Sequence, residues 1–324
     1  MKTVLVIGAG QLGSRHLQAL KLVQDDLKIS VVDPFQNSLD VAKERFEGFT
    51  GQGGNHTISY YQSVDELTDK SFDVVISASS CDRRFEALTK LLAKVDVKNF
   101  LLEKVLFNKE QDYHSFKKLL DEKKIKAFVN CSMRTMPFYR DIKEDFINTD
   151  LQYFVSGSNY RLMSNIIHYV DHMVYLSGCT EFTVDCSLLD KKFITSKREG
   201  FWEFNGTLIV KFANGSAGMF TSYNGGDSPA VIYINNEKCK IVSRESEGKI
   251  WMQKHSDEWK WNELDFRIPY QSEMTSKIVA DLLNTDKCEL VEYDESMNTH
   301  IQLYSPILEH FNKYNEKIDY YPFT

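Results

Sequence analysis

The segment VLVIGAGQLG, which begins at residue 4, constrains the fold more than any other part of the chain. An apolar run ends in glycines spaced G-x-G-x-x-G, and an amphipathic stretch follows at once. Gly8 permits a tight turn, Gly10 lets a diphosphate approach the backbone, and Gly13 lets the next helix pack against the strand. The start of that helix offers free N–H groups and a partial positive charge to phosphates. The pattern predicts the first strand–helix turn of a dinucleotide-binding Rossmann domain, with cofactor contacts from Gly8, Gly10, Gln11, Leu12 and Gly13.

An acidic residue follows the second apolar run. Asp33 lies 20 residues past Gly13, directly after Val31 and Val32. A carboxylate at this place accepts hydrogen bonds from both hydroxyls of an adenine ribose and repels a 2′-phosphate. No basic residue adjoins Asp33, so the sequence predicts NAD as the cofactor in preference to NADP. The alternative is that Asp33 only begins the turn at Pro34.

Short apolar runs alternate with amphipathic stretches through the first 130 residues or so. The predicted strands are 3–7, 28–32, 57–61, 73–78, 99–103 and 125–130, and the predicted helices are 12–23, 38–46, 83–94 and 111–123. Several strands are apolar throughout, as expected of parallel strands covered on both faces. The S-x-x-E sequence from Ser63 to Glu66 is a capping box, which predicts a short helix start. Residues 1–128 are therefore predicted to form a doubly wound parallel sheet.

The rhythm changes after about residue 130. Predicted strands are 153–160, 182–188, 207–212, 217–223, 230–234, 240–242 and 249–253, and predicted helices are 165–176, 273–283 and 295–312. Asn205-Gly206 and Asn214-Gly215 predict hairpin turns, because both residue types tolerate a positive φ. Residues 129–324 are predicted to form an α+β domain on a mostly antiparallel, open-faced sheet. The fold class is therefore α/β followed by α+β.

Length and composition narrow the class of protein. A chain of 324 residues suggests two domains. No apolar run approaches the roughly 18 residues that span a bilayer, and a net charge of −7 without a basic stripe argues against nucleic-acid binding. The six cysteines are scattered with no C-x-x-C pair, which favours free thiols over a disulfide framework or a metal site. We expect a cytoplasmic protein without a membrane segment, a nucleic-acid partner or a bound metal.

Four segments, in order and spacing, resemble the motifs of one enzyme family. They are the glycine loop with Ser14-Arg15-His16, Glu103-Lys104, VNCSMR ending at Arg134, and HYVD from His168 to Asp171. With the closing pair of helices after Tyr270, the whole chain resembles the glucose–fructose oxidoreductase, inositol dehydrogenase and rhizopine-catabolism family, Gfo/Idh/MocA. The resemblance implies hydride transfer between a nicotinamide cofactor and an alcohol carbon of a sugar, inositol or sugar nucleotide.

The resemblance assigns two catalytic residues. Lys104 matches the lysine of the family's Glu-Lys-Pro motif beside the nicotinamide, although Val105 replaces the proline. A lysine at the carboxyl end of a parallel strand points into the crevice where cofactors bind, and its ammonium orients a substrate oxygen; the alternative is a surface lysine. His168 is the candidate general base, since imidazole titrates near neutrality; the alternative is a core or capping histidine.

The chain departs from the family pattern at two places. Ser164 stands where the family has a substrate-binding Asp, although residues 164 and 168 keep the one-turn helical spacing. The ASSCDRR segment after the fourth strand lacks the family's Thr-Pro-Asn-x-x-His. Arg83 or Arg84 in this segment either faces the nicotinamide or begins a solvated helix, and the solvated helix is the favoured interpretation. Ser79 and Glu103 complete the predicted cofactor contacts. The predicted substrate contacts are Arg134, Tyr160, Arg161, Ser164, Asn165 and Asp171.

These features predict an NAD(H)-dependent oxidoreductase acting on a secondary alcohol or ketone of a sugar, sugar nucleotide or related polyol. Its expected partner is a small sugar-like molecule, and the resemblance implies a homodimer or homotetramer formed through the open sheet of the second domain. Two alternatives stay open. The first is a dinucleotide-binding regulator of the same fold that does no catalysis, which the changes at Ser164 and Val105 favour. The second is a dehydrogenase of a non-sugar substrate with a flat, apolar cleft.

Overall fold

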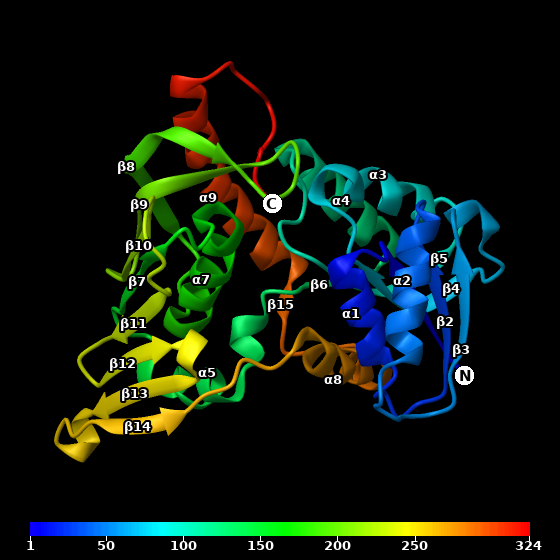
Figure 1. The fold of residues 1–324 in the computed structure, drawn as a ribbon, viewed down its shortest axis with the longest axis horizontal. Helices are drawn as coiled ribbons and strands as arrows, with labels where there is room; N and C mark the ends of the chain where they lie inside the picture. Colours follow the sequence, from blue (N-terminus) through cyan, green and yellow to red (C-terminus); the bar gives the residue numbers. More distant parts are fainter. The chain divides into compact units, whose positions relative to one another are not determined.

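The computed structural model describes residues 1–324 and divides into two compact units, each with its own sheet (Figure 1). The first unit comprises residues 1–130 and 269–296, and the second comprises residues 131–268 and 297–324. The break after residue 130 lies close to the expected boundary at 128. The division differs from the expected second domain, 129–324, in one segment, because residues 269–296 belong to the first unit.

The first unit is a seven-stranded sheet in the order β3-β2-β1-β4-β5-β6-β15. Its strands are β1 (Lys2–Ile7), β2 (Leu27–Val32), β3 (Thr57–Tyr61), β4 (Ser71–Ser77), β5 (Asp96–Leu102), β6 (Lys126–Val129) and β15 (Val291–Glu292). All neighbours pair in parallel except β15, which pairs antiparallel to β6. This confirms the predicted doubly wound sheet. The order reverses between β1 and β4, the point at which such sheets bind ligands beyond their carboxyl ends.

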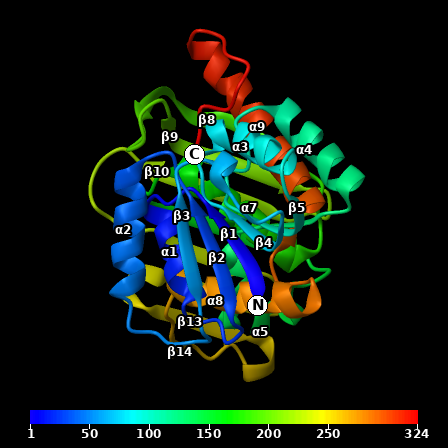
Figure 2. The same cartoon turned by 90° about the vertical axis from the view of Figure 1, so that its right-hand side faces the viewer.

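Helices cover both faces of this sheet, as Figure 2 shows with α1 and α2 beside one flank of the strands and α3 and α4 beside the other. The helices are α1 (Gln11–Leu20), α2 (Gln36–Glu47), α3 (Cys81–Leu92), α4 (Glu110–Lys123) and α8 (Gln271–Thr285). The apolar stripe of α8, with Ile278, Val279 and Leu282, joins the same buried core as Leu17 and Leu20 of α1. Burial of that stripe explains why residues 269–296 return to the first unit.

The second unit contains an eight-stranded sheet in the order β14-β13-β12-β11-β7-β10-β9-β8. Its strands are β7 (Gln152–Ser158), β8 (Phe182–Thr195), β9 (Trp202–Phe212), β10 (Ala217–Tyr223), β11 (Val231–Asn235), β12 (Cys239–Arg244), β13 (Lys249–Lys254) and β14 (Asn262–Asp265). Only β7 and β10 pair in parallel; the other neighbours are antiparallel. The predicted mostly antiparallel sheet is therefore confirmed.

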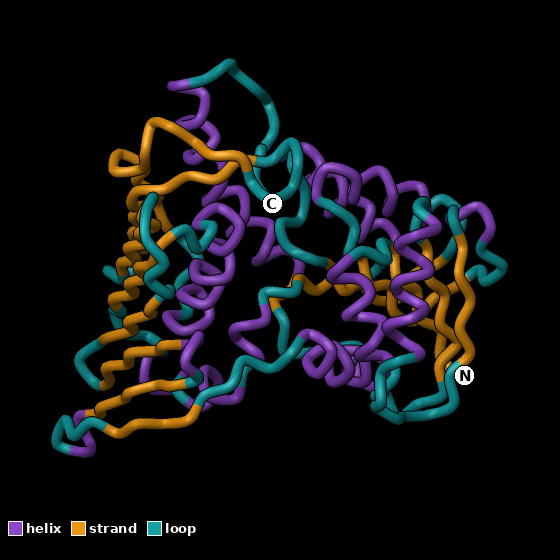
Figure 3. Tube along the Cα trace, viewed as in Figure 1, coloured by secondary structure: helices purple, strands orange, loops and turns teal.

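One face of this second sheet carries helices and the other is open (Figure 3). Its helices are α5 (Pro137–Asp141), α6 (Lys143–Phe146), α7 (Leu162–Ser177) and the part of α9 (Tyr293–Tyr314) from residue 297 onward. The long helix α7 packs on β9 and β10. Along β7, β10 and β11, buried residues alternate with more exposed ones, which places Phe154, Met219 and Tyr233 on the open face. A half-covered antiparallel sheet produces this alternation.

The two Asn-Gly dipeptides have different outcomes. Asn214-Gly215 lies in the turn between β9 and β10, where Gly215 has a φ of +93°, as predicted. The hairpin predicted at Asn205-Gly206 is wrong, because Gly206 lies inside β9 opposite an irregular stretch of β8. Its φ is +95°, and a Cβ there would lie 2.6 Å from the carbonyl oxygen of Leu188. Gly206 therefore allows two paired strands to approach closely. An Asn-Gly dipeptide alone does not distinguish such a position from a turn.

Shorter elements complete the chain. Four 3-10 turns occur at Val64–Glu66, Ser132–Thr135, Glu245–Glu247 and His255–Asp257. Ser63 is the N-cap of the first of these, and its hydroxyl oxygen accepts from the backbone N–H of Asp65, but the predicted reciprocal bond from the Glu66 side chain is not formed. No helix combines the length and apolar character that crossing a membrane requires. All six cysteines are unbridged.

Candidate functional site

The glycine loop of the first unit is built from three glycines that each meet a different requirement. Gly8 has a φ of +87°, and a Cβ on it would lie 2.7 Å from the backbone nitrogen of Ser79. A Cβ on Gly13 would lie 1.7 Å from the carbonyl oxygen of Gly8, so the strand and α1 meet there without room for a side chain. A Cβ on Gly10 would meet nothing within 4 Å. The protein's own packing therefore requires Gly8 and Gly13 but not Gly10.

The start of α1 fits the diphosphate of a dinucleotide. Gly10 is the N-cap residue, and no side chain caps the helix there. Gln11 and Leu12 form the first turn and are exposed. An uncapped helix start with a glycine open to solvent is the arrangement that lets phosphate oxygens reach backbone N–H groups. The residues present thus fit this part of the predicted cofactor.

Asp33 lies against this loop from the end of β2. The carboxylate is buried, with Oδ2 accepting from the backbone N–H of Ala9 at 2.7 Å and Oδ1 accepting from that of Phe35 at 2.9 Å. The same side chain therefore begins the turn after β2 and braces the glycine loop. Each carboxylate oxygen accepts more than one hydrogen bond, so acceptor positions remain for ribose hydroxyls.

Arg45 of α2 is a residue at this loop that the sequence motif does not identify. Its Nη2 donates to Oε1 of Gln11 at 2.8 Å, and its Nη1 donates to Oγ of Ser14 at 2.6 Å. A guanidinium beside the first turn of α1 adds positive charge where phosphate is expected. Arg45 is 34 residues from Gln11, and no local sequence signal links the two.

Glu103 was predicted to contact the cofactor, but its carboxylate takes part in a buried network. Its Oε1 accepts from Nε2 of His16 at 2.9 Å and from Nδ2 of Asn130 at 2.5 Å. The other ring nitrogen of His16 lies 2.8 Å from Oγ1 of Thr275. Burial raises the pKa of Glu103, but the hydrogen bonds and charge of His16, with smaller effects of Asn130 and Lys104, outweigh it and leave that pKa below its ordinary value. The network anchors the loop after β5 from within the unit.

Lys104 directly follows Glu103 and is partly exposed at the carboxyl end of β5. The peptide bond between Lys104 and Val105 is cis. Lys104 lies two residues past the end of β5, at the carboxyl edge of the sheet, and β5 neighbours β4, which flanks the point where the strand order reverses. The position agrees with the crevice that ligands occupy in such sheets.

The two arginines of the ASSCDRR segment lie in different environments. Arg83 is exposed, and its contact is a 3.6 Å ion pair with neighbouring Asp82. The solvated helix start favoured by the sequence holds for Arg83 but is wrong for Arg84, which is 2% exposed. Arg84 donates to backbone carbonyl oxygens, among them those of Ser79 and Glu103. The predicted contact residue Ser79 is thus held through its own main chain.

In the second unit, the start of α7 brings together the predicted residue Ser164 and one that the sequence missed. The Ser164 hydroxyl donates to Oε1 of Glu203, and the backbone N–H of Met163 donates to Oε2 of Glu203 at 2.7 Å. Glu203 is 3% exposed and comes from β9. A carboxylate at a helix start is favoured by the helix dipole. Glu203 therefore supplies a negative charge beside Ser164, the position at which the sequence lacks one.

His168 lies one turn after Ser164 on α7 and is partly exposed. The predicted helix is confirmed here, so the side chains of residues 164 and 168 leave the same face. Tyr160 and Asn165 flank the start of this helix, where Nδ2 of Asn165 donates to the carbonyl oxygen of Tyr160 at 2.6 Å. The Tyr160 hydroxyl is buried without a hydrogen-bond partner, and burial raises its pKa.

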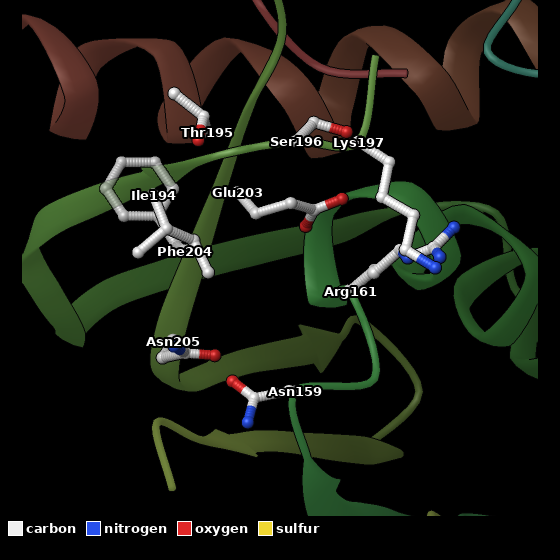
Figure 4. Close-up of a pocket in the computed structure, with 9 residues that line it drawn as sticks. All are labelled: Asn159, Arg161, Ile194, Thr195, Ser196, Lys197, Glu203, Phe204 and Asn205. Atoms are coloured by element: carbon white, nitrogen blue, oxygen red, sulfur yellow. The ribbon is translucent and has the colours of Figure 1, made fainter.

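A small cavity of about 160 Å³ opens beside Glu203 within the second unit (Figure 4). Arg161 and Lys197 both line it, and Figure 4 shows their side chains ending on the same side of Glu203. The remaining lining residues are Asn159, Ile194, Thr195, Ser196, Phe204 and Asn205. Seven of the nine lining residues carry polar or charged groups, among them two cations and one carboxylate, and Ile194 and Phe204 add apolar surface. Such a surface suits a ligand that carries hydroxyl groups and negative charge.

Arg134 and Asp171, both predicted to contact substrate, are bonded to each other. Nε of Arg134 donates to Oδ2 of Asp171 at 3.0 Å, and Nη2 donates to Oδ1 at 2.7 Å. Their side chains are 9% and 2% exposed. The Asp171 carboxylate therefore occupies the planar donor fork of the Arg134 guanidinium.

Next to this pair lies a buried aromatic cluster around His172. Nδ1 of His172 lies 3.1 Å from the Tyr153 hydroxyl, and its Nε2 is buried without a hydrogen-bond partner. The ring packs edge-on against Tyr139, with 4.3 Å between centroids. Burial, with a smaller effect of the Arg134 charge, lowers the pKa of His172 to about 3.

No group of three or more His, Cys, Asp or Glu side chains in the structure is arranged to bind a metal.

No family model and no curated protein sequence matches this chain. Solved structures do match. UDP-N-acetylglucosamine 3-dehydrogenase GnnA from Acidithiobacillus ferrooxidans aligns with a TM-score of 0.68 and 13% identity, over 92% of this chain and 94% of that one. An oxidoreductase from Agrobacterium radiobacter in complex with NAD+, L-tartaric acid and magnesium aligns with a TM-score of 0.68 and 15% identity, over 93% and 94%. Biliverdin reductase from Synechocystis sp. PCC 6803, in complex with biliverdin and NADP+, aligns with a TM-score of 0.67 and 12% identity, over 92% and 95%.

Two of these neighbours were solved with NAD+ or NADP+ bound, and the third is a dehydrogenase of a UDP-sugar; their fold is of the Gfo/Idh/MocA type. The chain has their fold. Because the identities are low, the likeness establishes the two-domain architecture and leaves substrate and cofactor preference to the residues themselves.

Within that fold, the predicted residues fall into two groups and one separate pair. Gly8, Gly10, Gln11, Leu12, Gly13, Asp33, Ser79, Glu103 and Lys104 lie at the carboxyl edge of the first sheet. Tyr160, Arg161, Ser164, Asn165 and His168 gather at the start of α7 in the second unit, and Arg134 with Asp171 forms a separate buried pair. The two predicted catalytic residues, Lys104 and His168, therefore come one from each unit.

Proposed function

We propose that the chain is an NAD(H)-dependent oxidoreductase that moves a hydride between nicotinamide and a secondary alcohol or ketone carbon of a sugar, sugar nucleotide or related polyol. One observation carries the proposal: Gly10 stands at an uncapped helix start, in a place where the protein's own packing does not require a glycine. A diphosphate that approaches the backbone explains that glycine. The fold shared with solved oxidoreductases supports the same cofactor class.

The proposed preference for NAD rests on Asp33. Its carboxylate is buried beside the glycine loop, where a 2′-phosphate would meet like charge at close range. We expect calorimetry to give a lower Kd for NADH than for NADPH, and Asp33→Ser to reduce that difference. A wild-type protein that binds NADPH as well as NADH would contradict the preference while leaving the oxidoreductase proposal intact.

The proposed mechanism gives Lys104 and His168 separate roles. When bound, the nicotinamide ring supplies or accepts the hydride. Lys104 holds the substrate oxygen with its ammonium and stabilises negative charge that develops there. His168 takes the hydroxyl proton from that oxygen when an alcohol is oxidised and returns it when a ketone is reduced. The neighbouring Ser164 hydroxyl has its proton committed to Glu203, so its oxygen accepts a hydrogen bond from a substrate hydroxyl.

The second unit supports a polar substrate. The cavity beside Glu203 is lined by amide, hydroxyl and charged groups, with Arg161 and Lys197 providing positive charge. A guanidinium and an ammonium near hydroxyl acceptors suit a sugar that carries a phosphate or carboxylate group. The two cations therefore favour a sugar nucleotide or acidic sugar over the uncharged, apolar substrate of the second alternative.

The decisive test combines binding with turnover. We expect NADH to bind in calorimetry, and a panel of UDP-sugars, aldonic acids and inositols with NAD+ to give NADH absorbance with at least one member. Lys104→Met and His168→Asn should each lower kcat by about 10²–10⁴, whereas the exposed controls Lys109→Met and His255→Asn should leave it unchanged. NADH binding without turnover on any substrate class would favour the regulator, and absence of binding would remove the proposal altogether.

The open face of the second sheet supports the proposed homo-oligomer. Phe154, Met219 and Tyr233 are 36–40% exposed on adjoining strands. An exposed apolar patch on a sheet face is typical of a subunit interface. Light scattering after gel filtration should therefore report a dimer or tetramer, and Met219→Glu should shift it to the monomer; a monomeric wild-type chain would contradict this part of the proposal.

A further inference from the structure

Arg84 is buried beneath two loops that follow adjacent strands of the first unit. One loop follows β4 and the other follows β5, its neighbour in the sheet. The two N–H groups on Nη1 of Arg84 are shared among three carbonyl oxygens of the second loop, those of Glu103 and Leu106 at 2.6 Å and that of Val105. Its Nη2 atom donates to the carbonyl oxygen of Ser79 in the first loop. One side chain therefore ties the two loops together through their main chains.

The loop after β4 is in turn packed against the glycine loop. The backbone of Ser79 lies so close to Gly8 that a Cβ on the glycine would come within 2.7 Å of the Ser79 nitrogen. The three loops thus form a series at the carboxyl edge of the sheet, running from the glycine loop through Ser79 and Arg84 to the loop that carries Lys104. Displacement of the middle loop would change the spacing between the two ends.

We propose that Arg84 is a positioning residue that fixes the Lys104 loop relative to the glycine loop, and so shapes the nicotinamide end of the cofactor site. The inference rests on the proposed function, because it assumes that a dinucleotide lies along these loops. A guanidinium suits the task because its planar donors point in fixed directions and its charge strengthens bonds to carbonyl oxygens. The exposed Arg83 next to it makes no such contacts and provides a matched control.

The test separates the two ends of the cofactor. NADH would occupy the whole proposed site, whereas ADP-ribose keeps the diphosphate and both riboses but lacks the nicotinamide ring that would lie beside Lys104. We expect wild-type protein to bind NADH more tightly than ADP-ribose in calorimetry. Arg84→Met should weaken NADH binding at least about tenfold, which is about 1.4 kcal/mol, and leave the Kd for ADP-ribose within about twofold. Arg84→Lys, which keeps a charged donor, should give an intermediate loss, and Arg83→Met should give none.

The outcomes distinguish the inference from the proposal beneath it. Wild-type protein that binds neither ligand contradicts the proposed function itself. Wild-type protein that binds NADH no more tightly than ADP-ribose overturns the inference alone, as does an Arg84→Met protein that keeps both affinities. Equal losses of both ligands in Arg84→Met and Arg84→Lys would show a general structural role and would also overturn it.

A double-mutant cycle tests whether Arg84 acts through Lys104. Lys104→Met alone should weaken NADH binding and spare ADP-ribose. If Arg84 acts by placing Lys104, the variant with both Arg84→Met and Lys104→Met should bind NADH no more than about twofold more weakly than the weaker of the two single variants, since coupled residues are not additive. Losses that multiply fully would show that Arg84 does not act through Lys104.

Discussion

Two buried arginines, one in each unit, show how differently the two halves of the molecule are built. Arg84 in the first unit donates to backbone carbonyl oxygens of loops at the sheet edge. Arg134 in the second unit pairs with the carboxylate of Asp171. Arg84 therefore acts on main-chain groups of its unit, whereas Arg134 acts on a side chain that is distant in sequence.

The two buried histidines repeat the contrast in another form. His16 in the first unit has a polar partner at each ring nitrogen, Glu103 on one side and Thr275 on the other. His172 in the second unit has a partner only at Nδ1 and is surrounded by aromatic rings. The polar partners of His16 stabilise charge on neighbouring groups, whereas the aromatic rings around His172 disfavour charge on its imidazole ring. We therefore expect the removal of a single side chain to lower the free energy of unfolding most in the second unit.

The largest effect is expected at the Arg134 and Asp171 pair. Arg134→Met leaves the Asp171 carboxylate buried without its partner, so it should lower the free energy of unfolding by about 3–5 kcal/mol. The variant with both Arg134→Met and Asp171→Leu should recover much of that loss, because an apolar pair can replace a buried ion pair. Urea denaturation of the single and double variants measures both. Additive losses would show that the pair is not the coupled unit that the contrast requires.

The next effect concerns the main-chain geometry of the first unit. Gly13→Ala places a Cβ 1.7 Å from the Gly8 carbonyl oxygen in the present structure, and should lower the free energy of unfolding by about 3 kcal/mol. Gly10→Ala meets nothing in the protein and should cost less than about 1 kcal/mol, while NADH binding weakens. Denaturation and calorimetry on the two variants check this. Equal stability losses would remove the distinction between a packing glycine and a binding glycine.

The same contrast explains what the sequence could predict. The glycine loop and Asp33 were identified because backbone geometry at a strand–helix turn permits few residue types. Both sheets could be predicted from the apolar residues, because buried parallel strands are apolar throughout whereas half-covered strands alternate apolar and polar residues. The return of residues 269–296 to the first unit was not predicted. The apolar stripe of α8 is compatible with the core of either unit, and only its packing against α1 decides between them.

The side-chain partnerships were not predictable in the same way. Glu203 meets Ser164 across 39 residues, and Arg134 meets Asp171 across 37. Nothing local marks such partners, because the contacts form only when the sheet and α7 pack together. Arg84 was misjudged for the same reason: a helix-start arginine looks solvated until the loops above it are in place. Where function depends on side-chain pairs, sequence reasoning located the segment and not the partner.

The smallest expected effect is a pH dependence that originates in the second unit. The pKa of His172 falls to about 3 in the folded protein from an ordinary value of 6.5, through burial and, to a smaller extent, the Arg134 charge. Below pH 6.5 the unfolded chain therefore binds a proton that the folded chain refuses. The contribution of His172 to stability is complete above pH 6.5 and declines by up to about 1.4 kcal/mol per pH unit as the pH falls toward 3.

His172→Asn removes this titration. Between pH 6.5 and 5.5, the wild-type free energy of unfolding should fall by about 1 kcal/mol more than that of His172→Asn, as measured by urea denaturation at the two pH values. The exposed control His255→Asn should follow the wild type. If all three proteins lose stability in parallel, the His172 ring is charged or hydrated in the folded state, and the second unit does not exclude charge as its aromatic surroundings imply. A smaller loss of stability in His172→Asn alone would instead assign this acid sensitivity to the His172 ring, beside the buried Arg134 and Asp171 pair.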